Sequence, residues 1–315
     1  MFPDSFPGWT VNNSFKSVLI IADIEGSSGC WSRRAAKFMT DEWYVASIEM
    51  TRDVSAVVTG LFETGIRKVT VHDFHRTGYN LLPEYVDSRA RVFSGYRAGP
   101  VPGIGDPKDA EAALFLGMHA ASGSNAFLSH TFTSRIQRLE VNGKAISEVE
   151  LFSASLAPYG VRPIFFSGCP VACTQAQRAI KGIDCYPIDK TVGQQGFDVD
   201  AWRAGLKGAA TKSLNNVGME PHLLEGPFKA VVTMRDGEKP AQRIARRWSF
   251  DCEGASISLK APNFNELYRD LIRICYLTPL IEKIVPLALL WYRLYGYFGL
   301  AMVRRHTRRL WRASV

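Results

Sequence analysis

Apolar runs alternate with helical patterns from the start of the chain's main body. Ser17–Ala22 reads SVLIIA, a short apolar run typical of a strand buried on both faces of a sheet. Thr40–Thr64 carries a helical pattern, with Thr40 suited to the N-cap and Gly65 to the stop. Lys68–Val71 follows as a second strand. This order predicts a right-handed βαβ unit with parallel strands.

The alternation continues through the first two thirds of the chain. The further elements we predict there are strands at Ala112–Gly117 and Pro163–Ser167, strands Ile136–Val141 and Lys144–Ile146 joined by the hairpin signal Asn142-Gly143, and helices at Glu148–Gly160 and Thr174–Lys181. From about Asp198 the pattern changes to helix Val199–Leu214, strands Phe228–Met234 and Ala255–Leu259, and helix Asn263–Tyr276. These elements predict a second, smaller unit of α+β type.

We therefore expect an α/β fold with a mostly parallel sheet flanked by helices, a smaller C-terminal α+β unit and an extra C-terminal hydrophobic and basic helix. The boundary falls near Asp189–Phe197, where two glycines flank two glutamines. The predicted division is an N-terminal extension at 1–16, the main α/β domain at 17–190, the α+β domain at 191–278 and a hydrophobic, then Arg-rich extension at 279–315.

Positive charge is concentrated at the C-terminus. The formal net charge is +8, and five arginines lie in the last dozen residues: Arg304, Arg305, Arg308, Arg309 and Arg312. Nucleic-acid binding proteins usually show a basic face interleaved with aromatic residues, and none is evident elsewhere in the chain. We therefore expect no nucleic-acid partner.

Cysteine usage and the N-terminus point to a cytoplasmic setting. The six cysteines form no CxxC pair, and a chain of 315 residues needs no disulfide scaffold, so we expect reduced, mostly buried thiols. Met1–Lys16 lacks the basic and apolar regions of a secretory signal. We therefore predict a cytoplasmic protein.

Four residues of metal-binding types follow predicted apolar strands: Asp23, Glu25, His75 and His119. The carboxyl ends of parallel strands share one edge of a sheet, so these side chains should converge. Two carboxylates and two histidines in one crevice need a compensating charge, and a divalent cation supplies it. Glu148 would add a third carboxylate. Five ligands of mixed oxygen and nitrogen type favour two zinc ions over one.

Each residue also has a purely structural interpretation. Asp23 and Glu25 could stabilise a loop against a helix N-terminus, and Glu148 could be an acid in the first turn of a helix. His72 alternates away from His75 along its strand and is interpreted as a core histidine. The metal hypothesis depends on the co-occurrence of these residues at successive strand ends.

Five segments in this order and spacing resemble the motif series of the DppA-like D-aminopeptidases, zinc peptidases encoded with dipeptide permeases. The segments are IADIEGSSG at 21–29, VHDFH at 71–75, LFLGMHA at 114–120, SHT at 129–131 and NGKAISEVEL at 142–151. The resemblance covers roughly Ser17–Tyr276 and is weaker in its second half. It implies a catalytic, metal-binding domain at 17–190 and assembly into a homo-oligomer.

The resemblance implies a role for each of these residues. Asp23, Glu25, His75, His119 and Glu148 would bind zinc, with Asp23 as the bridge between two ions. His130 matches the family's catalytic histidine, as nucleophile, acid or oxyanion donor, with a structural histidine as the alternative. Asp73 would orient a ligand histidine from outside the metal site. The implied function is hydrolysis of small peptide or amide substrates, with D-residues among them.

One segment departs from the family pattern. Gly168 is followed by Cys169-Pro170, where family members commonly carry an acidic pair. The departure keeps three alternatives open. The first is a metal-dependent amidase or deacylase, the second an acyl or aminoacyl transferase of a biosynthetic pathway, and the third a non-catalytic binding protein.

The last segment of the chain lies beyond the resemblance. Ile284–Val303 is twenty residues long with Arg293 as its only charge, which is long enough to span a bilayer. A helix lying in a membrane surface fits better, because tyrosines and a tryptophan at 291–297 are followed by arginines that suit anionic headgroups. We therefore predict membrane-surface contact through 284–312. Packing against the body or in an oligomer is the alternative.

Overall fold

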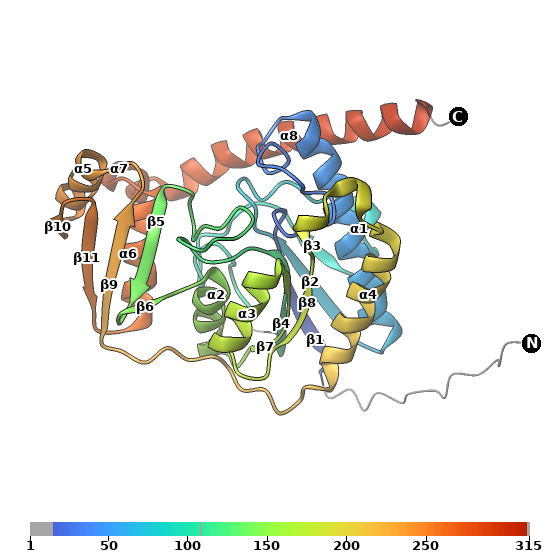
Figure 1. Ribbon diagram of the computed structural model, residues 1–315, viewed down its shortest axis with the longest axis horizontal. Coiled ribbons are helices and arrows are strands. Elements are labelled where there is room, and N and C mark those ends of the chain that lie inside the picture. Colours follow the sequence, from blue (N-terminus) through green and yellow to red (C-terminus); the bar gives the residue numbers. More distant parts are fainter. Residues whose placement is uncertain (1–14, 108, 314–315) are drawn as a thin grey trace, which may run out of the picture.

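Six parallel strands form the larger sheet of the molecule (Figure 1), in the order β3-β2-β1-β4-β7-β8. The computed structural model describes residues 15–107 and 109–313, and side chains only as far as Thr307. The strands are β1 Ser17–Ala22, β2 Lys68–Asp73, β3 Arg91–Phe93, β4 Ala112–Met118, β7 Arg162–Gly168 and β8 Asp184–Pro187. The predicted parallel sheet is confirmed, and β3 and β8 are additions to it.

Helices cover both faces of this sheet (Figure 1). On one side, α1 (Asp41–Glu63) packs beside α4 (Val199–Lys212); on the other lie α2 (Glu148–Leu156) and α3 (Pro170–Ala179). The Thr40 side chain accepts a hydrogen bond from the Trp43 N–H at 3.1 Å, which confirms the predicted N-cap of α1. Short 3-10 helices are η1 Pro83–Tyr85, η2 Ala157–Tyr159, η3 Lys190–Val192, η4 Gln194–Gly196 and η5 Ser213–Asn215.

The smaller sheet is antiparallel, in the order β10-β11-β9-β5-β6. Its strands are β5 Ile136–Val141, β6 Lys144–Ala145, β9 Phe228–Met234, β10 Asp251–Glu253 and β11 Ser256–Ala261, and its helices are α5 Glu238–Trp248 and α6 Phe264–Tyr276. The β5-β6 hairpin comes from the middle of the chain, whereas α4, which follows residue 190, packs on the larger sheet. The division at 190 and 278 stays a prediction, and most of the 1–16 extension lies outside the described residues.

Two helices close the chain: α7 (Pro279–Lys283) and α8 (Val285–Ala313). Figure 1 shows α8 running along one edge of the molecule, past both sheets. Leu300 and Val303 are buried in the core of the larger sheet, so the second half of α8 is packed on the body. Among the described residues, no helix is long and apolar enough to cross a membrane.

Candidate metal centre

The predicted ligands meet at the carboxyl edge of the larger sheet. β1 lies between β2 and β4, so the residues after these three strands converge. Asp23 Oδ1 lies 3.1 Å from His75 Nδ1, and Asp23 Oδ2 lies 3.4 Å from His119 Nε2. Glu25 Oε2 is 2.9 Å from His75 Nδ1, and Glu148 Oε2 is 3.6 Å from His119 Nε2. All five side chains are buried.

Two glycines allow the loop after β1 to lie against the end of β4. The Asp23 N–H donates to Leu116 O at 2.8 Å, and the Gly26 N–H donates to Gly117 O at 2.7 Å. Gly117 has a φ of 71°, and a Cβ there would collide with Asp23 O. A Cβ on Gly26 would collide with Met118 O. Glycine at both positions therefore brings the two ligand-bearing segments together.

Each of the three histidines of the site is held by a backbone carbonyl. In each, one ring nitrogen bonds a backbone carbonyl: His75 Nε2 to Ala36 O at 2.9 Å, His119 Nδ1 to Ala120 O at 3.2 Å, and His130 Nδ1 to Leu128 O at 2.8 Å. A carbonyl only accepts, so that nitrogen carries the proton. In His75 and His119 the other nitrogen faces carboxylates. A lone pair on that nitrogen would be repelled by the carboxylates, so the nitrogen must carry a proton or bind a metal ion.

Burial makes the protonation of this cluster unusual. Burial, together with the charge of Asp23, raises the pKa of Glu25 from 4.5 to about 7. Burial opposes charge on His119, but Glu148 and Asp23 outweigh it and raise the pKa of that imidazole from 6.5 to about 10. Protons thus compensate buried carboxylates in the absence of any other cation. A divalent ion would release those protons and supply the same positive charge.

The unpaired atoms of the cluster fit a metal ion. Among the described residues, His119 Nε2 is buried and accepts or donates no hydrogen bond, and Glu25 Oε2 is buried close to His75 Nδ1 without a hydrogen bond, because that nitrogen bonds Asp23 Oδ1. One ligand atom each from Asp23, Glu25 and His119 lies within 4.8 Å of the others, and the same holds for His119, His130 and Glu148. Carboxylate oxygens and imidazole nitrogens are the ligands that zinc takes in such mixed sites. The donor set therefore suits zinc.

His130 lies directly against His119. The two rings are stacked with centroids 3.8 Å apart and an interplanar angle of 13°. Burial against this neighbour and the charge of His119 lower the pKa of His130 from 6.5 to about 3, so the ring is neutral at pH 7. Since its Nδ1 is bound to Leu128 O, Nε2 is the nitrogen left for a substrate or an ion.

Asp73 and His72 lie just before His75 on the chain. Asp73 Oδ1 accepts a hydrogen bond from Asn80 Nδ2 at 2.8 Å, and the same amide donates to His75 O at 2.8 Å. Asp73 thus acts on the main chain of His75 rather than on its ring. His72 is buried and stacks on Phe93 with centroids 5.0 Å apart, as expected of a core histidine.

A partly buried ion-pair network holds the loop after Glu25 and was not predicted from the sequence. Asp53 accepts from the Ser28 N–H and from Ser28 Oγ, both at 2.8 Å. Arg203 donates to Asp53 Oδ1 at 2.9 Å and to Glu49 Oε2 at 2.6 Å. Asp53 and Arg203 lie 150 positions apart, so no local pattern in the sequence connects them.

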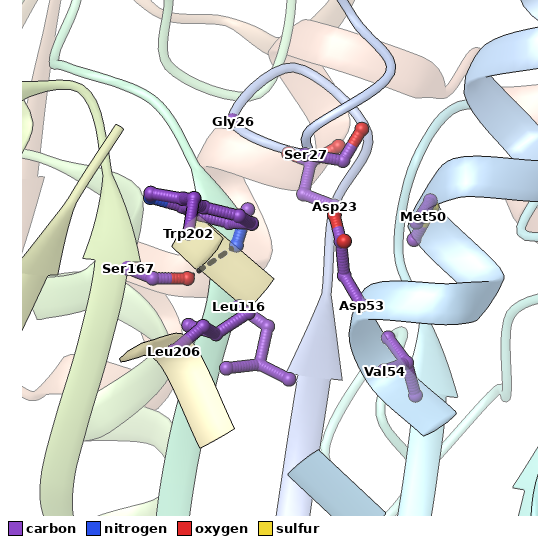
Figure 2. Close-up of a pocket in the computed structure, with 11 residues that line it drawn as sticks. Asp23, Gly26, Ser27, Met50, Asp53, Val54, Leu116, Ser167, Trp202 and Leu206 are labelled. Carbon is purple, nitrogen blue, oxygen red and sulfur yellow. Dashed lines mark hydrogen bonds between the residues drawn. The ribbon is translucent and has the colours of Figure 1, made fainter. Parts of the chain in front are cut away.

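A small cavity lies behind the metal centre, and Figure 2 shows its lining residues. Asp23, Ser27, Asp53, Ser167 and Trp202 are among them. Its volume of about 10 Å³ is room for about one water molecule. The Gly117 N–H donates to Ser167 Oγ at 3.0 Å across one wall. This space is too small for a substrate.

Comparison with known proteins agrees with this geometry. Residues 17–272 match the model of the D-aminopeptidase family. A D-aminopeptidase of Bacillus subtilis (strain 168) is 24% identical over 174 residues, which are 55% of this chain and 63% of that relative's own length. The solved structure of the Zn-dependent D-aminopeptidase DppA from Bacillus subtilis, described as a self-compartmentalizing protease, superposes with a TM-score of 0.73 at 18% identity, covering 82% of this chain and 96% of that one.

Proposed function

The chain belongs to the D-aminopeptidase family, and from this membership we propose that it is a zinc-dependent hydrolase of small peptides or amides. One observation carries the proposal. His75 Nδ1 and His119 Nε2 both face buried carboxylates, while the opposite nitrogen of each ring is bound to a backbone carbonyl. This is the arrangement of imidazoles prepared for a metal ion.

We propose two zinc ions per chain. Asp23, Glu25 and His75 would hold one, and His119 and Glu148 the other. Asp23 is suited to be shared, because one carboxylate oxygen faces His75 and the other faces His119. When bound, zinc lowers the pKa of a coordinated water toward neutrality and polarises the substrate carbonyl.

His130 has the geometry of a proton-transferring group. Its Nδ1 is bound to Leu128 O and its ring is fixed by the stack on His119, so Nε2 is held in one direction. We assign it the transfer of a proton to the leaving amine. The Asp73–Asn80 pair fixes the main chain of His75 and keeps that ring in place.

Metal content per chain is the first test, by elemental analysis of the purified wild type and variants. We expect close to two zinc ions in the wild type and the loss of at least one in His119→Ala. His130→Ala should keep its zinc and lose turnover of a dipeptide panel with D- and L-residues. Loss of zinc in His130→Ala would make this histidine a ligand instead. His72→Gln is the matched control, because its ring stacks on Phe93 in the core.

One observation favours a second candidate, amide cleavage or acyl transfer on a substrate without a free amino terminus. At the end of β7, Cys169 is buried where the family resemblance leads us to expect an acidic pair. Lys190 lies nearby; its amine donates to Ser27 O at 2.5 Å and sits 4.3 Å from the Trp31 ring centroid. The positive charge of Lys190 beside this loop disfavours binding of a substrate ammonium. Adding an amine acceptor and measuring its acylation in competition with water separates transfer from hydrolysis.

We also propose that the chain forms a homo-oligomer in the cytoplasm. The supporting observation is that the similar DppA structure is that of a self-compartmentalizing protease. Light scattering at several protein concentrations tests the assembly. A constant mass of one chain would contradict it.

A further inference from the structure

Helix α8 presents an apolar stripe to the outside of the molecule. Large side chains recur at intervals of three and four residues and are exposed: Ile284 just before the helix, and Leu287, Trp291, Leu294 and Phe298 within it. Trp291 is 68% exposed and Phe298 is 58% exposed. A stripe of this spacing is the face that a helix normally buries. Within the described residues, nothing covers it.

The opposite face of α8 fixes the helix to the body. A Cβ on Gly296 would collide with the Tyr79 ring, and one on Gly299 with Phe38, so the helix lies close against both side chains. Leu300 and Val303 are buried just beyond. The apolar stripe is therefore held outward by a packed inner face.

The charge on α8 identifies what the stripe can meet. The helix contains no Asp or Glu, and its sequence carries Arg293, Arg304, Arg305, Arg308, Arg309 and Arg312. Of these, Arg304 is paired with Glu84, whereas Arg293 and Arg305 form no ion pair within the described part of the chain. A second copy would bring like charges together. An anionic lipid surface would complement them, and tryptophan and tyrosine suit its headgroup region.

We propose that the exposed stripe of α8 docks on an anionic lipid surface, with the helix lying in the plane of the headgroups. The Tyr292 hydroxyl donates to Arg76 O at 3.2 Å, so α8 touches the loop that follows His75. Docking would thus place the strand-end loops beside the lipid. The proposal depends on the outer face of α8 and not on the zinc assignment.

Co-sedimentation of the full-length protein with vesicles tests this surface. We expect binding to vesicles of phosphatidylcholine with 30% phosphatidylglycerol and little binding to phosphatidylcholine alone. The double variant Trp291→Glu/Leu294→Glu should weaken anionic-vesicle binding at least tenfold. The charge variant Arg305→Glu, seven positions after Phe298 on the same side of the helix, should also weaken it and reduce its dependence on salt. Leu223→Glu is the matched control, because Leu223 is 67% exposed and belongs to no helix or strand.

Three outcomes would overturn the proposal. One is a wild type that binds neither kind of vesicle, and another is equal binding to both. The third is a stripe variant that falls in mass by light scattering while vesicle binding is absent, since this would assign the stripe to a second copy. The circular dichroism spectrum serves as the folding check, because it should be unchanged in every variant.

Discussion

The carboxyl edge of the larger sheet and helix α8 use buried and exposed side chains in opposite ways. At the sheet edge, carboxylates and histidines are buried, and one ring nitrogen of each histidine is bound to a backbone carbonyl. On α8, large apolar residues are exposed and the arginines Arg293 and Arg305 point to no acid among the described residues. Each region departs from the usual distribution of side chains in the direction that indicates a missing partner.

The difference between the two regions shows what a family match covers. The matched segment ends at residue 272, so it includes the sheet edge and leaves out α7 and α8. The sheet edge therefore lies in the part of the chain that matches the family, whereas the outer surface of α8 lies outside the matched part. Variants at the sheet edge and on α8 should therefore have separable effects.

Asp23→Asn should have the largest effect and should be confined to the sheet edge. The carboxylate faces both His75 and His119, so its loss should release zinc. The activation free energy should rise by several kcal/mol, which lowers kcat/KM by about a thousandfold or more. Vesicle binding through α8 should not change. Elemental analysis, a peptide assay and co-sedimentation on one preparation give all three readouts. A variant that kept both zinc ions would refute the assignment of Asp23 as the shared ligand.

Acid should destabilise the larger sheet through His72, with no counterpart on α8. Burial, aided by Arg97, lowers the pKa of His72 from 6.5 to about 4. The folded state thus favours the neutral ring, so this contribution is complete above pH 6.5 and is lost as the pH falls toward 4. The free energy of unfolding should fall by up to about 3 kcal/mol over that window.

The difference between the wild type and His72→Phe isolates this contribution, because other acids and histidines titrate in both proteins. Denaturant unfolding at pH 7, 5.5 and 4 gives the two stability profiles. The phenylalanine variant should lose less stability on acidification. Parallel profiles would show that His72 is not buried as a neutral ring.

Arg203→Met should weaken the metal centre without touching a ligand. The guanidinium holds Asp53, which holds Ser28 in the loop after Glu25. Loss of such an outer partner typically costs about 10- to 100-fold in metal affinity or activity. Arg52→Met is the control, since Arg52 pairs with the same Glu49 at 2.7 Å from the exposed side of α1. Competition with a zinc chelator measures the affinity, and equal losses in both variants would count against the network.

The sequence predicted where the candidate ligands lie because they follow a rule of local pattern. An apolar strand followed by a polar residue places that residue at the sheet edge, and Asp23, Glu25, His75 and His119 all lie there. Glu148 was named as a third carboxylate but had no strand end to place it, because it reaches the edge from the start of α2, after a hairpin of the other sheet. The parallel sheet and most helices were also predicted from local patterns of apolar and polar residues.

Other features could not be read from the sequence because they depend on contacts between distant segments. Arg203 has no local signal, and its partner Asp53 looks like any acid in a helix. Strands β3 and β10 are each three residues long, too short for a pattern. The inner and outer faces of α8 were ambiguous, because residues 284–303 are apolar nearly all round. Only the packing of Gly296, Gly299 and Leu300 shows which face is turned outward.

The smallest expected effect belongs to the contact that joins the two regions. The Tyr292 hydroxyl of α8 donates to Arg76 O, next to His75. Tyr292→Phe removes one hydrogen bond from a partly exposed contact, which contributes about 0.5–1.5 kcal/mol to stability, so kcat/KM should fall by at most about tenfold. Tyr295→Phe is the control, because its ring packs on Phe38 at a centroid distance of 4.6 Å. If adding anionic vesicles changed kcat/KM in the wild type but not in Tyr292→Phe, the outer face of α8 and the metal centre would be coupled through this bond. If kcat/KM were unchanged in both proteins, the outer face of α8 and the metal centre would be independent.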